Sequence, residues 1–229
     1  MKIVVKHTAD LKDKIIPCVK SLHRHYDNYQ VITFSPKKLA TYCNDFPNNR
    51  SSYYTAQGGE FIEWVTGDDD VICLLDADTI MQRTMTEEEK WLMTPKEGEF
   101  LACYCSYPPA TLDKAQRWLL CEKQIEVDKS YVEFCAAFLI ATKRTWMALR
   151  DIYVHEFFEL KKIMKHHAMT QWLINRIVQK HFTLKIMPDN IHNAEWYKGT
   201  MAILNEKQLF INDELVVFNH FKFQDKYYE

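Results

Sequence analysis

Residues 68–82 read DDDVICLLDADTIMQ, and this stretch carries the strongest structural signal in the chain. An apolar run at 71–75 leads directly into Asp76, Ala77 and Asp78. A short run of this kind is typical of a strand buried on both faces, as in the middle of a parallel sheet. Ligands of such sheets gather beyond the carboxyl ends of the strands. The stretch therefore predicts a buried strand that delivers two carboxylates to a binding edge.

The two aspartates are spaced so that they can act together. Side chains alternate along a strand, so Asp76 and Asp78 should face one side and Ala77 the other, and the small Ala77 leaves room for a ligand. Two carboxylates suit a hard divalent cation, which can neutralise a diphosphate leaving group. A second Asp-x-Asp pair, Asp68 and Asp70, precedes the strand and is expected to be a solvated turn.

The stretch VVFNHFK at 216–222 repeats the pattern of an apolar strand followed by a functional side chain. Here the strand ends in His220, and Lys222 follows. An imidazole can complete a ligand set with two aspartates, and mixed oxygen and nitrogen ligands favour Mn²⁺ over Mg²⁺. Lys222, or Lys226 further on, could contact a phosphate as a point charge.

The rest of the chain alternates strand-like and helix-like segments. This order predicts a single α/β domain over residues 1–229, with a mostly parallel central sheet flanked by helices. Thr86 and Glu89 form a capping-box pattern that starts one helix. Strands are expected at 2–7, 30–34, 70–75, 100–105, 133–142, 183–187 and 215–220, and helices at 11–25, 35–43, 59–67, from 86, and at 111–126, 143–166 and 168–181.

Composition excludes several classes of function. The net charge of −2 gives no support for general nucleic-acid binding, and the five glycines form neither a dinucleotide-binding nor a P-loop motif. The seven cysteines are odd in number, include no CxxC pair and lie mostly in apolar segments, which predicts reduced thiols and argues against a zinc site. No apolar run approaches the roughly 20 residues of a spanning helix, so a cytoplasmic location is expected.

The chain resembles GT-A fold glycosyltransferases, and most of all the glycogenin and bacterial galactosyltransferase group. The resemblance rests on four segments in this order: VICLLDADTI, YVEFCAAFLIAT, MTQWLIN and VVFNHFK. The resemblance implies that the chain transfers a sugar from a nucleotide-diphosphate sugar, most simply a UDP-sugar, to a hydroxyl acceptor. The residues that it matches to the donor site are Asp76, Asp78 and His220 as ligands of Mn²⁺ (or Mg²⁺), Lys222 or Lys226 on the diphosphate, Ala77 beside the donor, and His7, Thr8 and Ala9 at the nucleobase.

The same resemblance assigns the acceptor side to the start of the strand near 133–137. Glu133 is the candidate general base if the reaction inverts the sugar. Gln171 matches the glutamine of an Asp-Gln pair before the Leu-Asn of a late helix, although Thr170 stands where the family has aspartate. The segment FCAAF also lacks the asparagine and glycine that the family often has there.

Three alternatives stay open. A nucleotidyltransferase shares the layout and the acidic pair, but HTADLKDK lacks the glycine-rich loop that such enzymes carry after the first strand. If the chain were a non-catalytic nucleotide-sugar-binding protein, the threonine at position 170, where the family has aspartate, would be explained. The acceptor could be a saccharide or a modified DNA base, and the basic segments KRTWMALR and KKIMKHH could contact phosphates.

Overall fold

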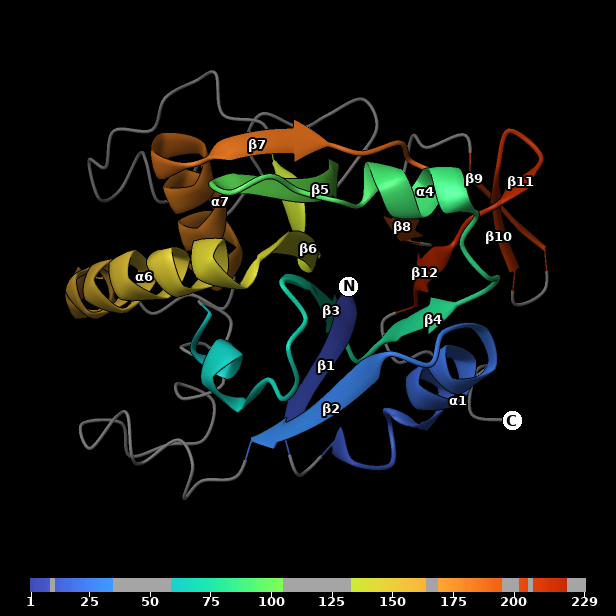
Figure 1. The fold of residues 1–229 in the computed structure, drawn as a ribbon, viewed down its shortest axis with the longest axis horizontal. Helices are drawn as coiled ribbons and strands as arrows, with labels where there is room; N and C mark the ends of the chain where they lie inside the picture. Colours follow the sequence, from blue (N-terminus) through green and yellow to red (C-terminus); the bar gives the residue numbers. More distant parts are fainter. Residues whose placement is uncertain are drawn as a thin grey trace.

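The computed structural model describes residues 1–8, 11–34, 59–104, 133–163, 169–194, 202–205 and 208–221. Within these ranges the chain builds a mixed α/β fold around a six-stranded sheet in the order β2-β1-β3-β6-β5-β7 (Figure 1). The strands of this sheet are β1 (Lys2–Thr8), β2 (Tyr29–Phe34), β3 (Val71–Asp76), β5 (Glu99–Tyr104), β6 (Phe134–Thr142) and β7 (Thr183–Ile186). The helices are α1 (Ile16–His25), the 3-10 helix η2 (Glu60–Trp64), α4 (Glu87–Leu92), α6 (Lys143–Ile163) and α7 (Met169–His181).

The central sheet confirms the predicted α/β layout with mostly parallel strands, and one of its strands is antiparallel to its neighbours. Strand β1 runs parallel to β2 and β3, and β5 runs parallel to β7. Strand β6 is inserted between β3 and β5 and runs antiparallel to both. Leu75 at the end of β3 pairs with Phe138, so the first residues of β6 extend toward the edge at which β3 ends.

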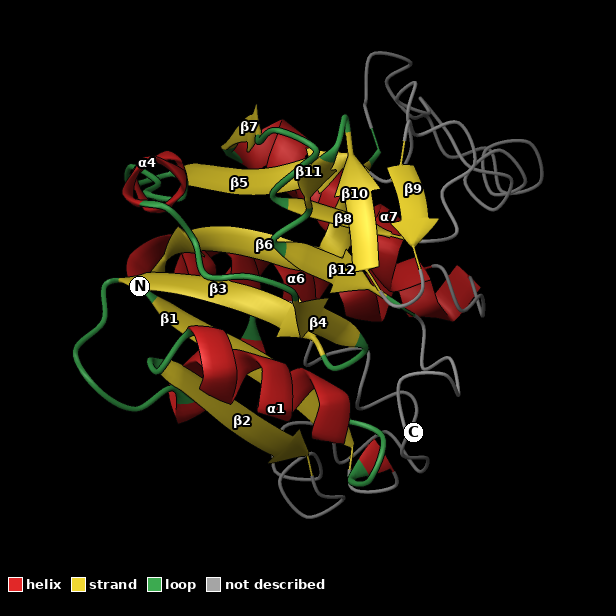
Figure 2. Ribbon diagram, turned by 90° about the vertical axis from the view of Figure 1, so that its right-hand side faces the viewer, coloured by secondary structure: helices red, strands yellow, loops and turns green. Residues whose placement is uncertain are grey.

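Alternation along the strands divides the core into two clusters, one on each face of the sheet. On one face Val4 and Leu74 belong to the cluster that includes residues of η2, α6 and α7, among them Trp146. The Trp146 indole donates a hydrogen bond to the carbonyl of Ile72 (3.1 Å), which ties α6 to β3. On the other face Val5 and Leu75 belong to the cluster that includes residues of α1 and the strand residue Phe218. Figure 2 shows α1 and α6 on opposite sides of the sheet.

Two small sheets complete the described fold. One has the order β4-β12-β8, formed by β4 (Thr79–Met81), β8 (His192–Ala194) and β12 (Phe218–His220). The other is antiparallel and contains β9 (Ala202–Asn205), β10 (Gln208–Ile211) and β11 (Glu214–Leu215). Asn212 and Asp213, both at positive φ, form the two-residue turn between β10 and β11. The single strand predicted at 215–220 is therefore wrong as one element, because it is divided between β11 and β12.

Local signals explain where the helices begin. The capping box at Thr86 is confirmed, since its hydroxyl accepts from the Glu89 amide (3.2 Å) and the Glu89 carboxylate accepts from the Thr86 amide (2.8 Å). Helix α1 starts at Ile16 rather than at residue 11, because Pro17 occupies the first turn, where its missing amide costs nothing. The predicted helices at 35–43 and 111–126 lie outside the described residues. No helix in the described ranges combines the length and apolarity needed to cross a membrane.

Candidate functional site

The acidic couplet, Asp76 and Asp78, spans the end of β3 and the turn that follows it. Asp76 is the last residue of β3, Asp78 lies in the turn, and β4 begins at Thr79. Ala77 is buried in the core cluster beneath, so the two carboxylates are left on the other side of the chain. Ligand atoms of Asp76, Asp78 and His220 all lie within 4.8 Å of one another. The structure thus brings together the three residues that were predicted from the sequence as cation ligands.

His220 reaches the couplet through strand pairing. Strand β12 is antiparallel to β4, and His220 is the register partner of Thr79. The amide of Phe221 donates to the carbonyl of Asp78 (2.8 Å), which fixes the end of β12 on the turn. The His220 Nε2 atom then lies 2.9 Å from Asp78 Oδ1. A ligand from near the end of the chain is therefore positioned by backbone hydrogen bonds rather than by a flexible side chain.

The charges of this cluster are strongly perturbed. Burial, together with a smaller effect of the neighbouring Asp78 carboxylate, raises the pKa of Asp76 to about 6 against the attraction of Lys6. For His220, burial lowers the pKa, but the charge of Asp78 and the hydrogen bond to it outweigh burial and raise the pKa to about 10. The imidazole of His220 and the carboxyl group of Asp76 are thus both strongly influenced by neighbouring charges in a poorly solvated place. Clusters of this kind are candidates for functional sites.

The donor set fits a divalent cation. Asp76 Oδ1 is buried and accepts no hydrogen bond from any described residue. A buried carboxylate oxygen without a partner is costly, and a cation would satisfy it. Two carboxylates and an imidazole suit Mn²⁺, and Mg²⁺ accepts the carboxylates equally well. On these grounds the residues can hold the cation that the sequence predicted.

Sequence reasoning missed Lys6, which the fold places beside the couplet. Lys6 is buried on β1 and is the register partner of Asp76 across the β1–β3 pair. Its positive charge lowers the pKa of Asp76, opposing the effect of burial. A signal was present in the sequence, because a lysine inside the apolar strand KIVVKHT must be buried, and buried lysines are rare without a charged partner.

Sequence reasoning also missed His192. It is buried on β8, and its ring stacks on Phe138 with a centroid distance of 4.8 Å and an interplanar angle of 7°. Burial lowers the pKa of His192 to about 4, which keeps the imidazole neutral. The polar segment around it gave no sign of a strand, so its position could be found only from the fold.

The start of β6 is held by amide side chains of α7. Gln171 accepts a hydrogen bond from the Ala136 amide (3.0 Å) and donates to the Phe134 carbonyl. Asn175 accepts from the Phe134 amide (2.9 Å) and donates to the same carbonyl (3.0 Å). Glu133 immediately precedes this clamped segment and is buried at 8% exposure. These contacts make Gln171 a positioning residue for β6.

The nucleobase candidates are only partly described. His7 is buried on β1, and its Nε2 lies 2.8 Å from the hydroxyl of Thr33 on β2. Thr8 ends β1, and the structure describes its backbone alone. Ala9, Lys222 and Lys226 lie outside the described residues, as does the side chain of Thr170.

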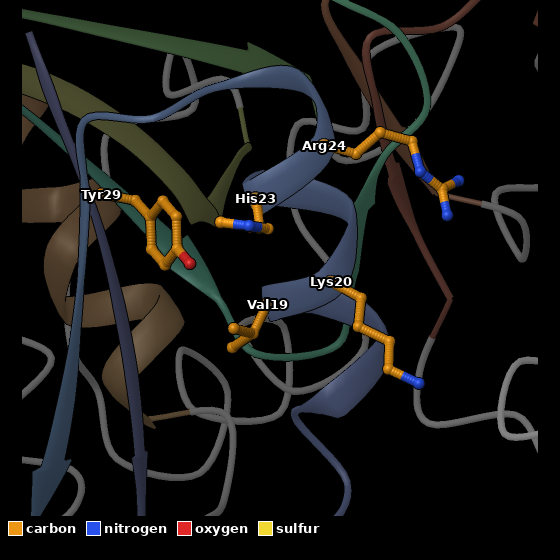
Figure 3. A pocket seen from close by; sticks show the side chains of 5 residues that line it. All are labelled: Val19, Lys20, His23, Arg24 and Tyr29. Carbon is orange, nitrogen blue, oxygen red and sulfur yellow. The ribbon is translucent and has the colours of Figure 1, made fainter.

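A surface hollow of about 490 Å³ lies elsewhere, between α1 and β2 (Figure 3). It is lined by Val19, Lys20, His23, Arg24 and Tyr29. None of these residues belongs to the acidic cluster, so this hollow is separate from the candidate site.

Comparison with known proteins identifies the fold. No family model matches the chain, and no curated protein matches it by sequence. Among solved structures, the galactosyltransferase LgtC in complex with donor and acceptor sugar analogues is similar at 13% identity, with a TM-score of 0.63 over 97% of this chain and 87% of that one. An active-site mutant of LgtC is similar at 14% identity, with a TM-score of 0.59.

The glycosyltransferase GlyE of Streptococcus pneumoniae TIGR4 is also similar. Its apo form shares 14% identity, with a TM-score of 0.50 over 83% of this chain and 46% of that one. At these identities the likeness shows the architecture alone. The chain has the GT-A fold that its sequence segments suggested.

Proposed function

We propose that the chain is a metal-dependent glycosyltransferase that moves a sugar from a nucleotide-diphosphate sugar, most simply a UDP-sugar, to a hydroxyl acceptor. The observation that carries the proposal is the convergence of Asp76, Asp78 and His220 at the end of β3 in a GT-A fold. Because LgtC was solved with donor and acceptor sugar analogues, a saccharide is the acceptor that we propose.

The three ligands would bind Mn²⁺ or Mg²⁺ together with the donor diphosphate. When bound, the cation supplies positive charge that stabilises the departing diphosphate. Asp76 and Asp78 would fix that charge in place, and the paired strands β4 and β12 keep the ligands preorganised. Lys222 or Lys226 would add a further contact to the phosphates, and His7, Thr8 and Ala9 would border the nucleobase.

The start of β6 is the proposed acceptor side. Glu133 provides a buried carboxylate at this position, where it would accept the proton of the attacking hydroxyl in an inverting reaction. Gln171 would act through β6, by holding the backbone of Phe134 and Ala136. We therefore assign Gln171 a role in positioning the acceptor side rather than in bond cleavage.

The test measures donor hydrolysis and donor binding with Mn²⁺. A panel of nucleotide sugars is screened by thermal shift, since a ligand that binds the folded state raises its melting temperature. Hydrolysis of the responsive donor is then compared between wild type and Asp78→Asn, with an expected loss of roughly a hundredfold or more.

The chain supplies a matched control, because Asp68 and Asp70 form a second Asp-x-Asp pair on exposed positions before β3. The double variant Asp68→Asn/Asp70→Asn removes two carboxylates of the same kind, one more than Asp78→Asn, and should keep wild-type turnover. Equal hydrolysis by wild type and Asp78→Asn would refute the metal role. Donor binding without turnover in the wild type would instead favour a binding protein.

A further inference from the structure

A second cluster of potential metal ligands lies next to the acidic couplet. Ligand atoms of Cys135, His192 and His220 lie within 4.8 Å of one another, and all three residues are buried. The cluster shares His220 with the acidic site but uses a thiol and a second imidazole in place of carboxylates. Its chemistry is therefore different from that of the aspartate pair.

Strand pairing brings these residues together from three separate parts of the chain. Strands β8 and β12 are parallel, with Phe218 beside His192 and His220 beside Ala194. Ala194, the register partner of His220, is two positions after His192 on β8. Side chains alternate along a strand, so both imidazoles lie on the same face of the small sheet. Cys135 is the second residue of β6. Because β6 runs antiparallel to β3 and begins where β3 ends, Cys135 lies near the acidic couplet.

The ring of His192 lacks a polar partner among the described residues, which indicates that it binds something from outside the protein. It is 1% exposed, and neither of its ring nitrogens has a hydrogen-bond partner among the described residues. The stacked Phe138 ring covers one face and offers no polar atom. A buried histidine normally satisfies at least one nitrogen, and those that bind metals do so through a ring lone pair.

We propose that Cys135, His192 and His220 bind a thiophilic divalent cation, with Zn²⁺ as the ion that this ligand set favours. One thiolate and two imidazoles are ligands of zinc sites, and soft donors select zinc over manganese or magnesium. Zn–S and Zn–N bonds of roughly 2.0–2.3 Å place tetrahedral ligand atoms about 3.5 Å apart, which small side-chain rotations can reach from the observed cluster. Binding releases the Cys135 thiol proton to solvent.

The site goes beyond the proposed transferase activity and can be measured without it. Because His220 belongs to both ligand sets, the identity of the bound cation decides which set holds it. Zn²⁺ should therefore draw His220 toward Cys135 and away from the acidic couplet.

The test is a titration of the metal-free protein with Co²⁺, followed by absorption spectroscopy. A thiolate-bound Co²⁺ gives a charge-transfer band in the near ultraviolet, and added Zn²⁺ should remove it by displacement. Because the chain has seven cysteines, the decisive result is loss of the band in Cys135→Ser. In His192→Gln, Co²⁺ should bind at least about tenfold more weakly, since even partners outside the ligand shell are worth roughly 10–100-fold in affinity.

Two controls separate this site from its surroundings. Cys73→Ser changes another buried thiol, on β3, and should keep the band. Asp76→Asn alters the acidic couplet and should also keep it. Absence of the band in wild type, or its persistence in Cys135→Ser, would overturn the proposal, whether or not the chain transfers sugars. If Cys135→Ser does not fold, the affinity of His192→Gln decides, and unchanged Co²⁺ binding there overturns the proposal as well.

Discussion

Replacing Asp76 with asparagine should stabilise the metal-free protein and remove its response to Mn²⁺. Burial holds the carboxyl group of Asp76 in a place that disfavours its charge, and one of its oxygens accepts no hydrogen bond from the described residues. Asparagine keeps the shape of the side chain but carries no charge. The variant therefore loses a cation ligand, and its metal-free folded state should be more stable than that of the wild type.

The magnitude follows from the pKa of Asp76, which rises from 3.8 to about 6 on folding. Below pH 3.8 the group is protonated in both the folded and the unfolded state and contributes no difference. As the pH rises toward 6, the unfolded chain loses this proton first, so the free energy of unfolding of the wild type falls. Above that pH the penalty is constant at roughly 3 kcal/mol, because one pKa unit corresponds to about 1.4 kcal/mol.

The assay is urea unfolding of wild type and Asp76→Asn in a metal chelator at pH 7.5 and pH 3.5. At the higher pH the variant should be more stable by up to roughly 3 kcal/mol, or about 6–12 °C in melting temperature for a chain of this size. At the lower pH the two proteins should be nearly equal. Added Mn²⁺ should raise the melting temperature of wild type and leave that of the variant almost unchanged. A variant less stable than wild type at pH 7.5 would refute the reasoning.

Two further substitutions test how the site is supported. Asn175→Ala leaves the Phe134 amide without its acceptor and removes one of the two side-chain donors to the Phe134 carbonyl, so we expect urea unfolding to show a loss of about 1–3 kcal/mol. Asn175→Asp should be no more stable than Asn175→Ala, because it buries a carboxylate against that carbonyl. Trp146→Ala empties a fully buried position that contacts Phe61 and Phe100 edge to face, which should cost about 3–5 kcal/mol in the same assay. A loss below about 1 kcal/mol for Trp146→Ala would mean that α6 is not anchored by this ring.

The sequence was sufficient for the elements whose signal is local. The apolar run before Asp76 predicted β3, the capping box predicted the start of α4, and the run before His220 predicted that a strand ends there. The direction of β6 was not predictable, because a fully buried strand reads as a continuous apolar run whichever way its neighbours run. Strands β8, β9 and β10 are too short to show a period, so they were missed.

The same distinction holds for the candidate site. Asp76, Asp78 and His220 each follow an apolar strand, which is a local pattern, and they were found. His192 lies in a polar segment, and its importance depends on pairing with β12, which is a long-range contact. The absence of a CxxC pair argued against a zinc site, and that expectation stays untested. The potential ligand atoms of Cys135, His192 and His220 come together through long-range strand pairing, which local spacing in the sequence does not reveal.

The position of β12 bears on how the protein is made. Synthesis proceeds from the N-terminus at roughly 5–20 residues per second, and domains can begin to fold while the chain emerges. The strands of the central sheet precede residue 187, whereas β12 spans Phe218–His220. A nascent chain could therefore assemble that sheet before His220 leaves the ribosome. The acidic turn would acquire its histidine only afterwards, which delays cation capture until the scaffold around it has formed.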